Sequence, residues 1–249
     1  MKFMLAFLLA LVGTAAAQSD NYPVKGKIDR SVQLSVGAAV NIKGIEGPLT
    51  VETGDVTTAE VHWTREAISQ KDYDCETIDV SEQPTLLTIT HRTDRSCKII
   101  QARETLRLVL PRSANLTAQG IEGSVIVSDT DGTVALSGIE GPVKIERVHS
   151  ARLRGIEGAV TLSVDQLASE GIEISGIEGA VNIAVADSVN ADIRVTGVDS
   201  KVTLPNAEIR KARSDDEDEE DRIHEARLGA GGSMISIRGV EGSVTVTKR

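Results

Sequence analysis

Aromatic side chains are almost missing from this chain of 249 residues, which contains one Trp, two Tyr and two Phe. Both Phe lie within the first seven residues, so the rest of the chain keeps only Tyr22, Trp63 and Tyr73. A bulky aromatic core is therefore excluded, and the interior must be built from Val, Ile, Leu and Ala. Such side chains suit thin β layers. Few rings also remain for stacking against sugars.

Positive charge is in short supply, with 27 Lys and Arg against 37 Asp and Glu, a net charge of −10. A nucleic-acid partner is disfavoured, because neutralising phosphates requires clustered basic residues. Seven of the acids stand together at residues 215–221 ("DDEDEED"), and the remainder of the chain is only mildly acidic. Most of the charge imbalance thus belongs to one segment.

Long apolar runs are missing except at the N-terminus. Residues 1–17 contain a basic start, an apolar stretch over 3–12 and a run of three Ala, which predicts a signal peptide cleaved before Gln18. No later segment approaches the ~20 apolar residues that span a bilayer, and no Cys follows the cleavage site to carry a lipid. We expect an exported chain without a membrane span, located in the periplasm, outside the cell or on its surface. Its net charge after cleavage is −11, from 26 basic and 37 acidic residues.

Cysteine occurs only twice, at Cys75 and Cys97. A reactive or metal-binding thiol pair would require a C-x-x-C spacing or a nearby His, and a separation of 22 residues offers neither. In an exported chain two cysteines form a disulfide, which is worth about 3 kcal/mol in the chain-entropy model. We therefore predict a Cys75–Cys97 disulfide.

A short phrase, Gly-Ile-Glu-Gly, is the main repeated feature. It begins at residues 44, 120, 138, 155 and 176, and two relatives follow as "GVDS" at 197–200 and "GVEG" at 239–242. In all seven copies the residues two and four positions before the first Gly, and five and seven after it, are apolar. This alternation predicts a short strand with one buried face on each side of the phrase. The Gly-containing corner changes the side-chain phase between the two strands, and Gly supplies the backbone freedom for that change.

The copies recur with a period near twenty, because successive first Gly residues are 76, 18, 17, 21, 21 and 42 residues apart. Strand-turn units of this length become stable by stacking on copies of themselves. We predict an all-β fold in which residues 113–249 form a parallel, β-helix-like β-solenoid. Consecutive antiparallel hairpins are the rival interpretation, but they would place equivalent residues on alternating sides.

Two insertions interrupt the repeats. Residues 18–112 are predicted to form an N-terminal β region with the first repeat and, over about 55–112, a disulfide-bearing insertion of antiparallel strands beside or capping the stack. Its strand-like stretches are "AEVHWT", "TLLTITH" and "TLRLVLP". Residues 206–232 hold the acidic run and "LGAGGS", a composition typical of a mobile loop. The 42-residue gap is then one interrupted turn of the stack.

Two stretches carry a family resemblance: an early "VNIKGIEGPLTVETGD" (40–55) and a central "LRLVLPRSANLTAQGIEGSVIV" (106–127), followed by the repeats. With them the chain resembles the DUF4097 family of adhesin-like, β-strand-repeat exported bacterial proteins, over nearly all of its length after residue 17. The second stretch looks like the family's strand, Pro and entry into the first repeat. The resemblance implies export, a β-solenoid and a role in the cell envelope or at the surface. It implies no catalytic residues, and the Cys75 to Cys97 insertion and the acidic loop depart from it.

The third residue of each corner is acidic. If the corners stack in register, these carboxylates form a column at the ~4.8 Å spacing of neighbouring strands. Its members are Glu122, Glu140, Glu157, Glu178 and Asp199, extended by Glu46 and Glu241 if those units join the stack. One interpretation is a charged edge that keeps the corners solvated; the other is a column that bridges Ca²⁺ or grips a basic partner. One acid per corner is sparser than the Gly-Asp pattern of calcium-binding nonapeptide repeats. No other cofactor is expected.

Catalytic motifs are missing. The four histidines, His62, His91, His149 and His224, are scattered among different segments without the spacing of a metal site, which indicates structural or solvated roles. No G-x-S-x-G, P-loop or Rossmann phrase is present. We expect a non-enzymatic, adhesin-like or envelope-associated scaffold that binds an envelope or surface protein or glycan. The alternative is a polysaccharide lyase or hydrolase on a β-helix, which would show a groove with two or more convergent carboxylates and a basic residue.

Overall fold

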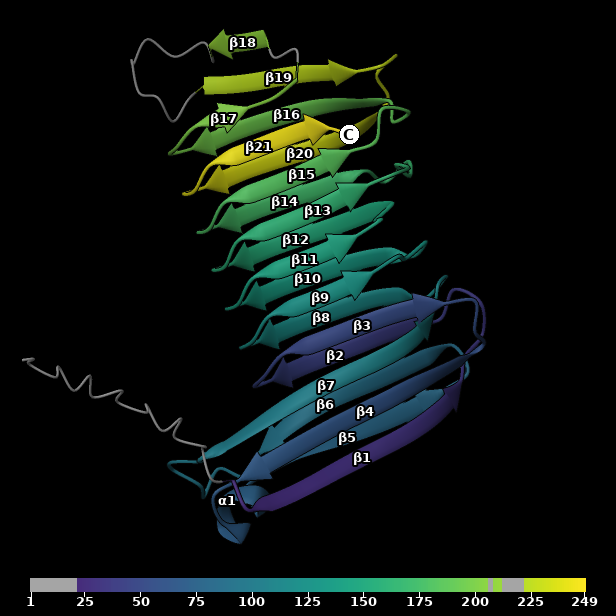
Figure 1. Cartoon of the computed structure of the whole chain (residues 1–249), viewed down its shortest axis with the longest axis vertical. Helices are drawn as coiled ribbons and strands as arrows, with labels where there is room; N and C mark the ends of the chain where they lie inside the picture. The colour runs from purple at the N-terminus through teal and green to yellow at the C-terminus, as the bar shows by residue number, and fades with distance from the viewer. Residues whose placement is uncertain (1–21, 206–207, 212–221) are drawn as a thin grey trace, which may run out of the picture.

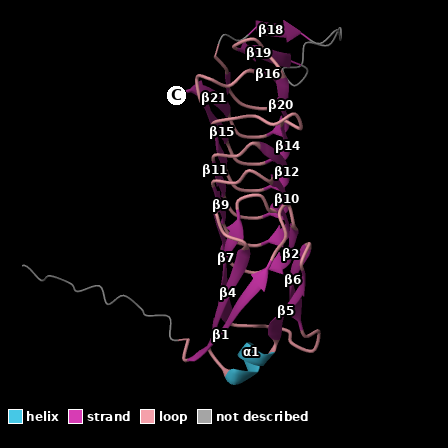
Figure 2. Cartoon of the chain, turned by 90° about the vertical axis from the view of Figure 1, so that its right-hand side faces the viewer, coloured by secondary structure: helices cyan, strands magenta, loops and turns pink. Residues whose placement is uncertain are grey.

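The computed structural model describes residues 22–205, 208–211 and 222–249. The predicted signal peptide and the acidic run at 215–221 lie outside the described residues. The described chain forms two β-sheets that face each other along the long axis of the molecule (Figures 1 and 2). One five-residue helix, α1 (Gln70–Asp74), lies at the foot of the sheets. The all-β prediction is therefore confirmed. None of the described helices has the length and apolarity to cross a bilayer.

The two sheets contain ten and eleven strands. Sheet A runs in the spatial order β1 (Val24–Gln33), β4 (Thr58–Ala67), β7 (Ala102–Pro111), β3 (Leu49–Gly54), β9 (Val125–Ser128), β11 (Val143–Glu146), β13 (Val160–Val164), β15 (Val181–Val185), β21 (Val244–Lys248) and β17 (Val202–Thr203). Sheet B runs in the order β18 (Glu208–Lys211), β19 (Arg222–Leu228), β16 (Ala191–Val198), β20 (Ser233–Val240), β14 (Ile172–Ile177), β12 (Ser150–Ile156), β10 (Thr133–Ile139), β8 (Asn115–Ile121), β2 (Ala39–Ile45), β6 (Leu86–Thr93) and β5 (Glu76–Gln83).

Each repeat supplies one strand to sheet B before its corner and one strand to sheet A after it. Strands of neighbouring repeats pair in parallel, for example β10 with β12 and β11 with β13. The apolar residue after the first Gly of each corner pairs with its counterparts in the neighbouring corners. In spatial order these are Ile45, Ile121, Ile139, Ile156, Ile177, Val240 and Val198. The predicted in-register stacking of the seven corners is thus present.

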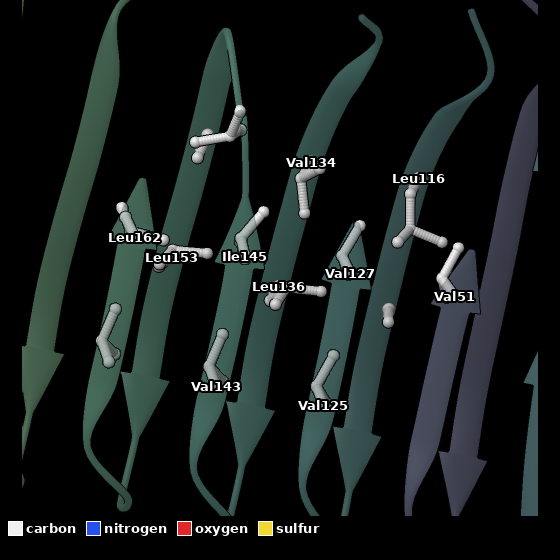
Figure 3. Packing of buried hydrophobic residues seen from close by; sticks show 14 of the residues in the cluster. Val51, Leu116, Val125, Val127, Val134, Leu136, Val143, Ile145, Leu153 and Leu162 are labelled. Atoms are coloured by element: carbon white, nitrogen blue, oxygen red, sulfur yellow. The ribbon is translucent and has the colours of Figure 1, made fainter. Parts of the chain in front are cut away.

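The apolar positions that define the repeat line the space between the sheets (Figure 3). Of the 28 residues at these positions, 26 are buried, and the other two, Val202 and Leu204, are half-buried at the last corner. Their burial on both sheets explains why the alternation is strict: a polar residue there would face only apolar neighbours. Hydrophobic burial between the sheets is what holds the repeats together.

The sheets are mixed rather than wholly parallel. In the N-terminal insertion β4 pairs antiparallel with β7, and β5 with β6, while β7 and β6 pair in parallel with the first repeat. The three strand-like stretches of the insertion fall on β4, β6 and β7, except that Thr85 precedes β6, so their prediction as strands is confirmed. These strands extend both sheets toward α1 and continue the same apolar interior (Figure 1).

The order of the last two repeats differs from their order in the sequence. The C-terminal repeat, β20 and β21, lies between the repeats of β14 and β16, so the 42-residue gap is not one interrupted turn. The copy at 197–200 ends the stack, with its short strand β17 on the edge of sheet A. A steric reason favours this order, because this copy has Ser200 in place of the second Gly and only an end position leaves its corner room to shift.

The interpretation of 206–232 as a mobile loop is wrong for Arg222–Leu228. These residues form β19, which pairs antiparallel with β16. Ala226 and Leu228 are buried, with 7% and 1% exposure. Without β19 the edge of β16 would leave backbone groups unpaired, and the strand covers them. Residues 206–207 and 212–221 of the segment lie outside the described residues.

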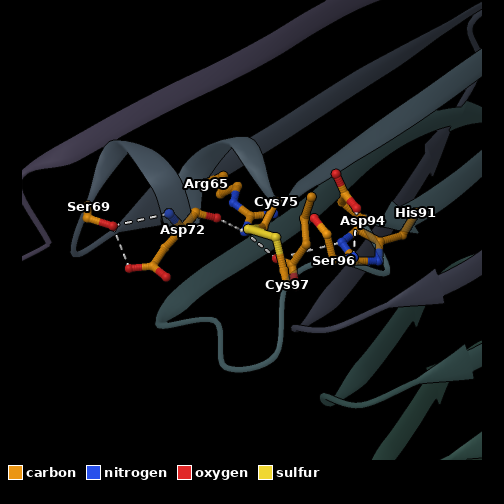
Figure 4. The surroundings of a disulfide bond; sticks show 9 residues. Arg65, Ser69, Asp72, Cys75, His91, Asp94, Ser96 and Cys97 are labelled. Carbon is orange, nitrogen blue, oxygen red and sulfur yellow. Dashed lines mark hydrogen bonds and ion pairs between the residues drawn. A yellow bond between two sulfur atoms is a disulfide. The ribbon is translucent and has the colours of Figure 1, made fainter.

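The predicted disulfide between Cys75 and Cys97 is present (Figure 4), with the two Cα atoms 6.0 Å apart. Cys75 follows α1 directly, and Cys97 lies in the connection between β6 and β7. The backbone N–H of Asp94 also donates to the Cys75 carbonyl, at 2.7 Å. The crosslink thus ties the helix at the foot of the molecule to the loop between the two sheets.

Candidate functional site

The corner carboxylates form the predicted column. Beyond the first corner, each acidic residue donates its backbone N–H to a carbonyl of the neighbouring corner, as Glu140 does to Ile121 at 3.0 Å. In spatial order the column is Glu46, Glu122, Glu140, Glu157, Glu178, Glu241 and Asp199. The sequence pattern therefore identified which carboxylates come together. No bound cation is needed for this arrangement, because backbone hydrogen bonds hold it.

The foot of the column is capped by Glu104, which no sequence pattern singled out. Glu46 belongs to the first corner, and its backbone N–H donates to Glu104 Oε1 at 2.8 Å. The other carboxylate oxygen, Oε2, accepts from Trp63 Nε1 at 2.7 Å. The Glu104 carboxylate thus takes the place of the carbonyl that a further corner would supply.

Below this cap, charged side chains are buried between the sheets. The Arg65 side chain is 0% exposed and forms an ion pair with Glu76, whose side chain is 4% exposed. Arg65 Nη2 also donates to the carbonyl of Asp72 in α1, at 3.0 Å. The guanidinium therefore connects β4, where it originates, to both α1 and β5.

His91 on β6 lies beside this ion pair, and its side chain is only 3% exposed. Its Nε2 is 3.9 Å from Glu76 Oε2 and 3.7 Å from Glu104 Oε2, and its Nδ1 is 3.8 Å from Glu46 Oε1. These separations exceed hydrogen-bond length. His91 Nε2 and Glu76 Oε1 are accordingly both buried without a hydrogen-bond partner.

A pocket of about 360 Å³ opens from this cluster to solvent. It is lined by Gly44, Glu46, His91, Thr93, Gly120, Ile121, Glu122, Gly138 and Glu140. Gly44, Gly120 and Gly138 all have positive φ, between 59° and 73°, a conformation that Gly adopts without strain. The bare backbone of the three corners thus forms one wall. Three carboxylates and one imidazole converge on the space.

The carboxylates at the pocket have shifted pKa values. Burial raises the pKa of Glu46, and the nearby Glu76 raises it further, while His91 acts in the opposite direction. Burial also raises the pKa of Glu122, and its column neighbours Glu46 and Glu140 add to the shift. Both groups therefore hold their protons to higher pH than a free Glu, because ionisation adds charge to a partly desolvated, acidic site.

We expect Glu122→Gln to stabilise the chain at pH 7 by a few tenths of a kcal/mol, the size of a screened repulsion between column neighbours. A raised folded-state pKa means that the folded chain binds more protons, so stability falls as pH rises through the window between the unfolded and folded pKa values. The stabilisation by Glu122→Gln should therefore disappear at about pH 4. Urea unfolding at both pH values measures it.

The matched control is Glu82→Gln, an exposed carboxylate on β5 outside the column, which should leave stability unchanged. A loss of stability in Glu122→Gln at pH 7 would show instead that this carboxylate holds the corners together.

Sequence reasoning missed the cluster because its members come from four separate segments. His91 was interpreted as a structural or solvated histidine, and Arg65, Glu76 and Glu104 were not singled out. A usable signal did exist: Arg65 and Glu104 occupy inward positions of alternating strands, where the repeat elsewhere places apolar residues. An ionisable residue on a buried strand face indicates a partner on another strand.

A second charged feature lies on the solvent face of sheet B. Glu173 on β14 accepts hydrogen bonds from Arg152 Nε at 3.2 Å, Arg154 Nη2 at 3.0 Å and Arg238 Nη2 at 2.6 Å. Arg194, in register with Ser236 beside them, lies 3.4 Å from Glu225. We call Arg152, Arg154, Arg194 and Arg238 the Arg patch. Burial disfavours the charged form of Glu173, yet the hydrogen bonds from Arg152 and Arg154 hold its pKa below the ordinary value.

Comparison with known proteins finds structural similarity only. No family model matches the chain, and no curated protein matches it. A "putative cell adhesion protein" from Clostridium sporogenes is 11% identical, with a TM-score of 0.43 over 90% of this chain and 100% of that one. A "putative adhesin" from Bacteroides fragilis is 13% identical, with a TM-score of 0.30 over 90% and 98% of the two chains. A "putative adhesin" from Parabacteroides merdae is 9% identical, with a TM-score of 0.28 over 90% and 96%. Similarities at this level assign no residue role to this chain.

Proposed function

We propose that this chain is an exported, non-enzymatic, adhesin-like scaffold of the cell envelope, a β-solenoid whose stacked repeats present the Arg patch to an anionic envelope polysaccharide. The observation that carries the proposal is the Arg patch itself, a local excess of positive charge on a chain with a net charge of −10. Among the side chains that the structure describes, four guanidinium groups there face two carboxylates, those of Glu173 and Glu225.

The geometry of the patch suits a polymer. Its Arg residues lie on neighbouring strands of one sheet, with Arg154, Ser175 and Arg238 in register along one row. Neighbouring strands repeat at ~4.8 Å, so donors are presented at regular intervals along the stack. Arg binds carboxylate and phosphate groups through paired N–H donors. The side chains are half-exposed, at 57%, 54% and 57% for Arg152, Arg154 and Arg238, and can therefore reach a ligand in solvent.

Export is supported by two features. The N-terminal sequence is typical of a signal peptide, and the Cys75–Cys97 disulfide is the kind of crosslink that persists in oxidising compartments. The DUF4097 resemblance of the sequence points to the same location.

We expect the chain without residues 1–17 to bind polygalacturonate, a polymer with a carboxylate on every sugar, and not neutral dextran. Arg154→Ala/Arg238→Ala should weaken binding roughly tenfold, since it removes two charge-assisted contacts. Affinity electrophoresis in gels that contain each polymer measures both effects.

The control is Arg107→Ala/Arg147→Ala, which removes the same charge away from the patch. Arg107 pairs with Glu52 on sheet A, and Arg147 pairs with Asp129 between strands. Equal weakening in both double variants would mean non-specific attraction, and the patch would lose its role.

The pocket at the foot of the column favours a second candidate, a polysaccharide lyase or hydrolase. It holds convergent carboxylates and one histidine, the arrangement that acid–base cleavage of a sugar chain requires. The raised pKa of Glu122 suits a proton donor. Trp63 cannot stack on a sugar, because it is 2% exposed and bonded to Glu104.

A reducing-end assay on envelope polysaccharide separates the two candidates. Turnover that is lost in Glu122→Gln would establish the enzyme and overturn the non-enzymatic proposal. Binding without turnover, under conditions where polygalacturonate binding is measured, supports the scaffold.

A further inference from the structure

The buried cluster at the foot of the column leaves four polar atoms without a hydrogen-bond partner: the donors Arg65 Nε and Nη1, and two atoms that carry lone pairs. His91 Nε2 and Glu76 Oε1 have no hydrogen-bond partner, although their side chains are 3% and 4% exposed. A buried polar atom without a partner costs about 1–3 kcal/mol. A proton on Nε2 would not solve the problem, because the carboxylate oxygens that face it are 3.7 and 3.9 Å away. A cation between these groups would satisfy them.

The charges around the site also favour a cation. Glu46, Glu76 and Glu104 surround His91, and Arg65 is the one basic side chain that the described residues pair with them. Glu104 has both oxygens engaged, one by the backbone of Glu46 and one by Trp63. Arg65 neutralises Glu76, so the negative charges of Glu46 and Glu104 remain without a basic partner of this kind beside His91.

We propose that Glu46, Glu76 and His91 bind a divalent transition-metal ion, with Zn²⁺ as the expected occupant. One ligand atom from each residue lies within 4.8 Å of the others. A tetrahedral zinc centre with ligand bonds of about 2.0–2.1 Å places its ligand atoms roughly 3.4 Å apart. His91 Nδ1 stands 3.8 Å from Glu46 Oε1, and His91 Nε2 stands 3.9 Å from Glu76 Oε2. Because only one imidazole nitrogen binds a given ion, the Glu46 side chain, which is 39% exposed, has to rotate toward the nitrogen that Glu76 shares. The ligand atoms then contract from within 4.8 Å of one another to about 3.4 Å.

The number and type of the ligand atoms favour a transition-metal ion over Ca²⁺. One imidazole nitrogen with two carboxylates suits Zn²⁺ and its transition-metal neighbours. Ca²⁺ takes about six to eight oxygen ligands, and the cluster cannot supply that number. The site shares Glu46 with the foot of the carboxylate column, but its other two ligands, Glu76 and His91, come from β5 and β6 rather than from a corner.

Access and rigidity favour the same assignment. The pocket of about 360 Å³ reaches His91 and Glu46 from solvent, with Glu122 and Glu140 along it to attract a cation. The three ligands come from the first corner, from β5 and from β6. A bound ion would join the first repeat to the N-terminal strands beneath it, independently of whether the Arg patch binds a polymer.

The test is a titration of the chelator-treated chain, lacking residues 1–17, with Zn²⁺ alone. We expect one ion per chain and a rise in Tm of roughly 5–10 °C at about a hundredfold excess over Kd. Co²⁺ should give the visible absorption of a four-coordinate site. His91→Gln and Glu46→Gln should each weaken binding by at least about tenfold.

Glu178→Gln is the matched control, a column carboxylate two corners above the pocket, and it should bind Zn²⁺ like the unchanged chain. Glu46 is 39% exposed, so Glu46→Gln remains informative even if His91→Gln fails to fold. No saturable Zn²⁺ binding, or binding that survives Glu46→Gln, would overturn the proposal. Loss in Glu178→Gln, or equal competition by Ca²⁺, would place the ion on the column and also overturn it.

Discussion

Replacing Gly158 by Ala is expected to destabilise the chain by about 3 kcal/mol, because an added Cβ has no room at the second Gly of a corner. An ideal Cβ on Gly158 would lie 2.5 Å from the carbonyl carbon of Gly141 and 2.5 Å from the nitrogen of Pro142. These are backbone atoms of the neighbouring corner, which is itself held by hydrogen bonds on both sides. Two corners cannot move apart without stretching the hydrogen bonds between the neighbouring strands of both sheets.

The same close approach recurs at every internal corner. A Cβ would lie 2.5 to 2.6 Å from the nearest backbone atom of the corner below at each of them, namely at Gly123, Gly141, Gly158, Gly179 and Gly242. The second Gly is thus required by contact between corners, whereas the first Gly is required by its own backbone angle. Thermal unfolding should show a fall in Tm of about 10 °C for Gly158→Ala.

Two further substitutions make the prediction specific. Gly155 has φ of +60°, but its Cβ would meet only ordinary contacts, at 3.8 Å. Gly155→Ala should therefore cost about 1 kcal/mol from backbone strain alone. Ser200 occupies the second position of the end corner, where its Oγ donates to the Glu241 carbonyl at 3.1 Å. Ser200→Ala should change stability by less than about 1 kcal/mol. A Gly158→Ala variant as stable as Ser200→Ala would contradict close stacking of the corners.

Replacing Arg65 by Met is expected to cost about 3–5 kcal/mol, because it leaves the buried carboxylate of Glu76 without its counter-charge. Met fills a similar length in the interior but provides no charge and no donor for the Asp72 carbonyl. Urea unfolding of the two chains measures the loss.

The double variant Arg65→Met/Glu76→Leu tests the cause. Removing both charges should recover most of the lost stability, since a buried ion pair contributes little compared with apolar residues of the same shape. An additive loss in the double variant would mean that Arg65 acts through packing or through α1. The matched control is Arg92→Met, which breaks the exposed ion pair of Arg92 with Asp79 and should cost less than about 1 kcal/mol.

The repeats could be predicted from the sequence because one local rule governs them. Apolar residues at fixed offsets around each corner, with Gly at its first position, indicate two strands and a turn without any knowledge of the neighbours. The column from Glu122 to Asp199 followed from in-register stacking. The disulfide followed from an even cysteine count in an exported chain.

The remaining features depend on contacts between distant segments. The place of the last repeat between β14 and β16 reflects which corner can tolerate Ser200, and the strand β19 forms because β16 offers an edge. The cluster of Arg65, Glu76 and His91 arises because β4, β5 and β6 continue the two sheets beneath the first corner. Sequence spacing does not encode these distances.

The sequence by itself determined an all-β chain of seven corner units, the residues that face its interior, the aligned carboxylates and the disulfide, because each depends on short-range periodicity or on composition. Tertiary structure alone decided the order of the units, the Arg patch on sheet B and the buried charged cluster. The physical reason is that a β-ladder joins residues by register, whatever their separation along the chain. Glu46, Glu76 and His91 therefore meet only after both sheets have assembled around them.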